Sequence, residues 1–242
     1  ADKLERELPL VAAAYVITDE ATYRDYLVRQ LDEIAGWEKF QRPGWTLNIK
    51  SRKVPPDYDD GVYIAVGPLI AGVVQALDIV GEDALPADTV ASIRQRLEIE
   101  MKRIVEDFRA EKGYFVREHL PYTNPWVSTI QGAFVAAAYL GRDRFADEYE
   151  YAKARLMESA RALDAPDGGF SEGFVYTVSR VLPNLEVVRY WMRRKGDRAF
   201  QDVNFFSTYP EWICAQYQPG GFVVNCFDGY AATRGQYDRV FS

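Results

Sequence analysis

The sequence predicts an all-α protein, built as an incomplete α/α toroid of about four antiparallel helix hairpins. Three observations predict this fold. Apolar residues recur at helical spacing along most of the chain, strand-like sequence is confined to residues 221–225, and short turns alternate with long connections. The short turns centre on residues 18–20, 81–83, 141–143 and 196–197, and the long connections cover residues 37–61, 113–124, 164–173 and 218–229.

Eight helices are expected, and the central ones alternate between two kinds. Residues 61–80 and 125–140 are apolar almost all round, as inner helices are, whereas residues 88–112 and 142–163 are charged and amphipathic, as outer helices are. This pairing repeats at about 50–60 residues and predicts a row of helix hairpins. The other helices are expected at residues 2–17, 21–36, 173–195 (distorted at Pro183) and 198–217 (interrupted at Pro210).

Composition favours one domain covering residues 1–242. Hydrophobic residues make up 48%, enough for a sizeable core, and the net charge of −7 argues against a general nucleic-acid binder. No apolar run approaches the roughly 20 residues of a membrane span. Cys214 and Cys226 lack metal-ligand spacing and could form a disulfide or stay free thiols. With one histidine in the chain, we expect no metal and no cofactor.

The long connections point to the functional end of the molecule. In an up-and-down helical array, alternate connections lie at opposite ends, so the four long ones share an end. The first of them is basic and aromatic: between Trp37 and Pro56 it has five cations and one anion. Such a segment on an acidic protein favours an anionic ligand. Its candidate binding residues are Trp37, Gln41, Arg42 and Trp45, although the aromatic rings could equally belong to the core.

Two helix starts follow at the same end. Asp60 closes an acidic cluster before the third helix, where capping is the simplest role and acid/base work is an alternative. Asn124 before Pro125 reads as an N-cap, and it would place an amide at the mouth of the array. Trp126 follows it. His119, the single histidine, is a candidate proton carrier, although a lone loop histidine is more often incidental.

The last cluster lies at the start of the seventh helix. Glu172, Tyr176 and Arg180 are spaced by four residues and would share one helical face. A salt-bridge ladder is the plain interpretation of this spacing. The functional interpretation is a tyrosine whose ionisation Arg180 favours and whose position Glu172 fixes, because a nearby cation lowers a tyrosine pKa.

Three motifs follow one another in a recognisable order. They are Trp37 with Phe40-Gln41-Arg42-Pro43-Gly44, then Asn124-Pro125-Trp126 opening an alanine-rich helix, then Asp167-Gly168-Gly169-Phe170-Ser171-Glu172-Gly173 with Tyr176. Together they resemble the helical domain of heparinase II/III-like polysaccharide lyases, over about residues 10–200. The strongest element is the last run.

The resemblance implies an incomplete α/α toroid followed by a β-sandwich domain outside this chain. It implies cleavage of a uronic-acid polysaccharide or oligosaccharide by β-elimination, in a bacterial protein of the periplasm or cytoplasm. Asn124 would help to neutralise the substrate carboxylate, and Tyr176 would donate or accept the proton. The chain departs from the pattern at Pro125, where many relatives have a histidine.

Two other functions stay open. A glycoside hydrolase on the same toroid would use a carboxylate pair drawn from Asp59, Asp60, Asp167 and Glu172. A non-catalytic polysaccharide-binding domain would use the same mouth without turnover.

Overall fold

The protein is mostly helical, which confirms the predicted all-α class. A computed structural model describes residues 3–41, 61–164, 172–219 and 222–224. The helices are α1 (Leu4–Thr18), α2 (Ala21–Ala35), α3 (Val66–Val80), α4 (Ala87–Arg109), α5 (Tyr114–Arg117), α6 (Asn124–Gly141), α7 (Ala146–Ala162), α8 (Gly173–Tyr176), α9 (Leu182–Arg194) and α10 (Phe205–Ala215). A 3₁₀ turn, η1 (Glu82–Ala84), and a π-helical turn, η2 (Thr177–Val181), lie between them.

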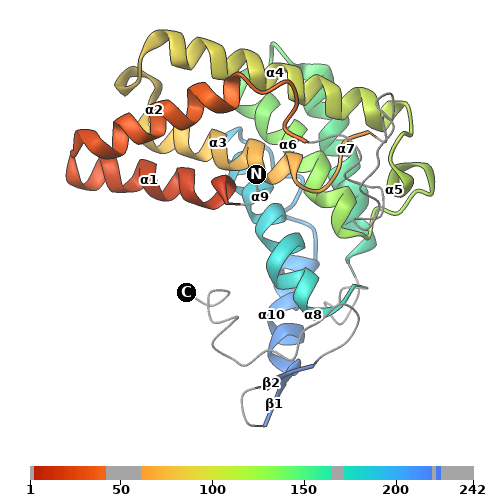
Figure 1. The fold of residues 1–242 in the computed structure, drawn as a ribbon. Coiled ribbons are helices and arrows are strands. Elements are labelled where there is room, and N and C mark those ends of the chain that lie inside the picture. The colour runs from red at the N-terminus through yellow and green to blue at the C-terminus, as the bar shows by residue number, and fades with distance from the viewer. Residues whose placement is uncertain (1–2, 42–60, 165–171, 220–221, 225–242) are drawn as a thin grey trace, which may run out of the picture.

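The long helices form two layers (Figure 1). In the inner layer α1 packs on α3, α3 on α6 and α6 on α9, and in the outer layer α2 packs on α4 and α4 on α7. The core lies between the layers and includes most of α3 and α6, whose residues are buried almost all round. This is the predicted alternation of apolar inner and amphipathic outer helices. Closure of the layers into a toroid stays a prediction.

Two glycines bring the inner helices into close contact. A Cβ added to Gly67 of α3 would lie 1.8 Å from the backbone oxygen of Ser128, and one added to Gly132 of α6 would lie 2.6 Å from the Gly67 Cα. Only glycine fits such an approach. Both positions lie in the first halves of their helices, so the starts of α3 and α6 are held near each other.

The predicted seventh helix is divided by a change of helical type. Residues 173–176 are α-helical, residues 177–181 form the π turn, and the Leu182 N–H donates to the Thr177 carbonyl in the i→i+5 pattern. Pro183 explains the change, because it has no N–H and its ring would clash with the carbonyl four residues earlier in an α-helix. The distortion predicted at Pro183 is thus confirmed, but it lies in the turn before the proline.

Buried amides tie α9 to α6. The Asn184 Nδ2 donates to the Ser128 Oγ at 2.7 Å, and the Gln131 Nε2 donates to the Asn184 Oδ1 at 2.8 Å. All three side chains are buried. These bonds fix α9 against the inner helix that carries Asn124.

Other boundaries differ from the predicted ones. The third helix begins at Val66 and not at residue 61, and the last begins at Phe205 and not at residue 198, with Pro210 inside it. The short helix α5 was not predicted. The strand expected at residues 221–225 is β2 (Phe222–Val223), paired antiparallel with β1 (Tyr217–Gln218). No helix in the described ranges is long and apolar enough to cross a membrane.

Candidate functional site

A carboxylate from a distant segment holds the start of α6. The predicted N-cap, Asn124, is instead the first helical residue, and Thr123 occupies the cap position without a side-chain capping bond. Glu172 takes over that function: its Oε2 accepts the Asn124 backbone N–H, and both its oxygens accept from the Asn124 Nδ2, at 3.1 and 3.0 Å. A carboxylate is stabilised there by the positive end of the helix dipole.

The side-chain oxygen of Asn124 is a buried acceptor without a partner. Asn124 is 4% exposed, and its Oδ1 has no hydrogen bond among the residues that the structure describes. Leaving such an acceptor unpaired costs about 1–3 kcal/mol. A group of this kind is suited to receive a hydrogen bond from a ligand.

Tyr63 interacts electrostatically with two other tyrosines, Tyr114 and Tyr176, and with Glu172. The Tyr63 ring lies 6.5 Å from the Tyr114 ring and 6.1 Å from Phe115. Burial raises the pKa of Tyr63 well above its ordinary value, and Tyr114, Tyr176 and Glu172 raise it further. Tyr63 is therefore a protonated phenol at neutral pH. It also belongs to the same local group as Tyr176 and Glu172, although these residues are far apart in the sequence.

Tyr63 and Tyr114 are functional candidates that sequence reasoning missed. Tyr63 lies just after the long connection 37–61, and Tyr114 lies at the beginning of the long connection 113–124. The interaction of Tyr63 with Glu172 depends on the tertiary fold. No sequence motif includes these two tyrosines. They could have been predicted only from their position at the end of the helical array that carries the long connections.

Gln41 holds the backbone that carries Tyr63. Its Nε2 donates to the Gly61 carbonyl at 2.9 Å, and its Oε1 accepts the Tyr63 N–H at 2.6 Å. The side chain is buried, and both its amide nitrogen and its amide oxygen are hydrogen-bonded. Gln41 was predicted to bind substrate directly; here it joins the two ends of residues 41–63 and sets the position of Tyr63.

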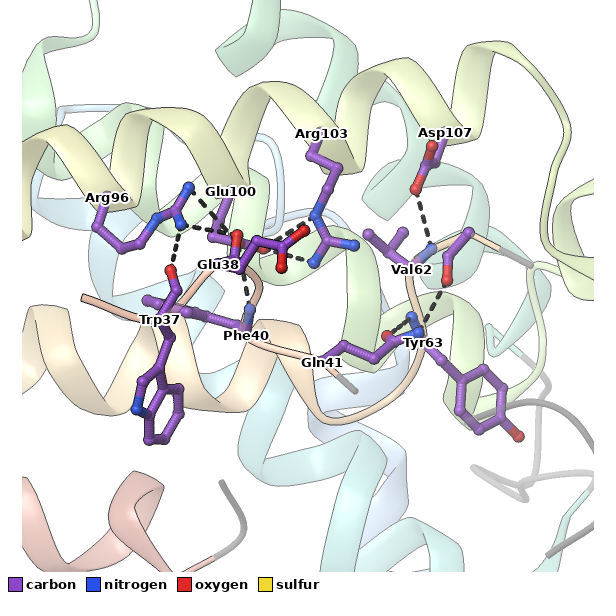
Figure 2. A network of polar contacts seen from close by, with 11 residues as sticks. Trp37, Glu38, Phe40, Gln41, Val62, Tyr63, Arg96, Glu100, Arg103 and Asp107 are labelled. Atoms are coloured by element: carbon purple, nitrogen blue, oxygen red, sulfur yellow. Dashed lines mark hydrogen bonds and ion pairs between the residues drawn. The ribbon is translucent and has the colours of Figure 1, made fainter. Parts of the chain in front are cut away.

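One face of α4 also fixes the two segments that Gln41 joins, residues 37–41 and 61–63 (Figure 2). The Glu100 carboxylate is 0% exposed; it accepts the Phe40 N–H at 3.2 Å and the Arg103 Nε at 3.0 Å. Arg96 donates to the carbonyls of Trp37 and Glu38, and the Val62 N–H donates to Asp107 at 3.0 Å. Figure 2 shows that the Tyr63 ring points away from this network.

Trp37 and Trp126 differ in what they can offer a ligand. Trp37 is half-buried, with its ring edge-on to Phe40 at 6.3 Å. Trp126 is 1% exposed, and its Nε1 donates to the Arg155 carbonyl at 3.0 Å. Trp126 was predicted to bind substrate, but a ring enclosed by the core has no surface for stacking. We leave it out of the candidate site.

His119 and Arg180 face other partners. His119 has a φ of 51° and is exposed; its ring lies 5.5 Å from Trp126, and its Nε2 lies 3.9 Å from a Glu158 oxygen. The Arg180 Nη1 lies 3.9 Å from a Glu5 oxygen on α1. Of the three residues predicted to share one helical face, Glu172 is the N-cap residue of α8, Tyr176 is its last residue, and Arg180 lies in the π turn.

Several predicted site residues lie outside the described residues. They are Arg42, Trp45 and Asp60 and, from the hydrolase alternative, Asp59 and Asp167. Glu172 is the member of that carboxylate set that can be placed. Within the described part of the chain, no group of three or more His, Cys, Asp or Glu residues is arranged to hold a metal ion.

Comparison with protein families and with curated proteins identified no relative of this chain. Protein-family models give no match to this chain, and curated proteins give none at the level required.

Proposed function

We propose that the chain is the helical domain of a polysaccharide lyase that cleaves a uronic-acid polysaccharide by β-elimination. The site would consist of Asn124, Glu172, Tyr176 and Tyr63. The observation that carries the proposal is the Asn124–Glu172 pair, which joins the last two motifs of the sequence at the start of α6.

The chemistry of elimination accounts for these residue types. The C5 proton of a uronic acid becomes acidic when the charge that develops on the adjacent carboxylate is stabilised. Tyr176, as a phenolate, would take that proton, and the C5–H bond electrons would form the C4=C5 double bond as the C4–O bond breaks. The same tyrosine would return the proton to the departing oxygen.

Glu172 would orient Asn124 for this work. An amide nitrogen carries two N–H groups. One of them, shared between the two Glu172 oxygens, would leave the second for the substrate carboxylate. The unpaired Oδ1 would accept from a sugar hydroxyl, and the protonated Tyr63 would supply a further neutral donor.

The test is turnover of a panel of uronic-acid polysaccharides by the full chain, followed by the ultraviolet absorbance of the unsaturated product. Tyr176→Phe should lower the rate by about 10²-fold or more, because the general base and acid is lost. Tyr190→Phe is the matched control, since Tyr190 is exposed and bonds to Asp78 at the opposite end. New reducing ends without absorbance would instead identify a hydrolase, and binding without either product would identify a binding domain.

A further inference from the structure

A cavity lies away from the site just described. It has a volume of about 370 Å³ and lies between the end of α9 and the start of α10. Its floor is apolar, formed by Met192, Phe200 and Val203, which are all buried. A cavity of this size, with an apolar floor and a few polar groups, is at the lower end of the range for small-molecule sites.

Two of the four charged residues that line this cavity have partners. Arg189 donates to Glu186 at 3.2 Å, and its guanidinium lies 4.9 Å from the centre of the Phe206 ring. Asp197 is bound by the Lys153 Nζ at 2.5 Å and accepts the Ala199 N–H at 3.0 Å. These pairs leave little net charge for a ligand.

Arg193 is different. It lines the cavity and is exposed, and its side chain has no hydrogen bond or ion pair within the described part of the chain. Its neighbour Arg194, by contrast, is bound to Asp78 and Tyr190. A free guanidinium presents a planar pair of donors that matches a carboxylate.

The rest of the rim is neutral apart from Asp202. Gln201, Asn204 and Ser207 supply uncharged polar groups, and Asp202 supplies one exposed carboxylate. One free cation beside one anion suits a singly charged ligand. A phosphate, with more negative charge, would meet stronger repulsion from Asp202.

We propose that this cavity binds a small organic monocarboxylate, with its carboxylate on Arg193 and its apolar body on the floor of Met192, Phe200 and Val203. The site is independent of the proposed lyase function, because it lies at the opposite end of α9 from the π turn.

Calorimetric titration of the full chain tests this site, with benzoate and cyclohexanecarboxylate as probes and inorganic phosphate and phenylalanine as comparisons. Both carboxylates should bind, more weakly at high salt. Arg193→Gln should weaken binding about tenfold or more, whereas Arg198→Gln, an exposed arginine outside the lining, should not. Asp202→Asn should tighten binding, because it removes a repelling charge.

Three results would overturn the proposal. They are equal binding by wild type and a folded Arg193→Gln variant, tighter binding of phosphate than of benzoate, and binding of phenylalanine alone that is lost in Asp202→Asn. The last would identify a site for zwitterions. Circular dichroism of each variant separates lost binding from lost folding.

Discussion

The two ends of the helical array use their polar residues differently. At the end with long connections, Glu100, Asp107 and Asn124 are buried, and each is hydrogen-bonded to a distant segment: to the Phe40 N–H, the Val62 N–H and the Glu172 carboxylate, respectively. At the end with short turns, polar side chains form ion pairs that are only partly buried. Examples are Glu82 with Arg94 and Asp78 with Arg194.

The two kinds of polar group therefore contribute differently to stability and to positioning. The partly buried pairs are screened by water and contribute little each. The buried groups hold backbone in fixed positions, and the Asn124 Oδ1 has no hydrogen-bond partner among the residues that the structure describes. Precise positioning of reactive groups needs the second arrangement.

Glu100→Ala should give the largest loss of stability. It leaves Arg96 and Arg103, both mostly buried, without their shared carboxylate, and breaking a buried pair costs about 3–5 kcal/mol. Urea unfolding measures the loss. The matched control is Glu98→Ala, whose partners Lys102 and Arg144 are exposed and whose loss should cost at most about 1 kcal/mol. Equal losses would remove the contrast between the ends.

Glu172→Ala should have a smaller effect, of about 1–3 kcal/mol, because the Asn124 backbone N–H and amide lose their acceptor in a buried place. Asp78→Ala, at the other end, removes an acceptor from the exposed Arg194 and Tyr190 and should cost about 0–1 kcal/mol. Thermal or urea unfolding compares the two. A larger loss in Asp78→Ala would contradict the assignment of the buried network to the long-connection end.

The smallest effect concerns pH. Burial would raise the pKa of Glu82, but hydrogen bonds from Tyr139 and Arg94 outweigh it and hold that pKa below its ordinary value. The folded pKa is the lower one, so Glu82 stabilises the fold above its unfolded pKa. This contribution is lost as the pH falls through its folded pKa.

Glu82→Gln should therefore be slightly less stable than wild type at neutral pH and equal to it in acid. The loss is small because the Glu82 side chain is 35% exposed. Urea unfolding at a series of pH values measures the difference. A difference that grows towards acid would show the opposite sign of the shift.

The helical pattern predicted more of the fold than of the site. The nearly continuous apolar stretches of α3 and α6 predicted inner helices because few polar residues interrupt them. The sequence also placed Asn124 and Glu172 at one end. It did not predict their contact, which joins positions 48 residues apart. The sequence likewise did not reveal that the Trp126 ring is buried in the core, nor that Gln41 would bind the backbone of Tyr63.

The π turn before Pro183 makes the number of residues in segment 177–181 important for the geometry around it. A π turn contains one residue more than the α turn it replaces, so α8 and α9 are out of helical phase with each other. Removing one residue from 177–181 would rotate Tyr176 by about 100° relative to α9, which Asn184 fixes on α6. The number of residues in this segment, as much as their identity, therefore determines the direction of the Tyr176 side chain relative to α9.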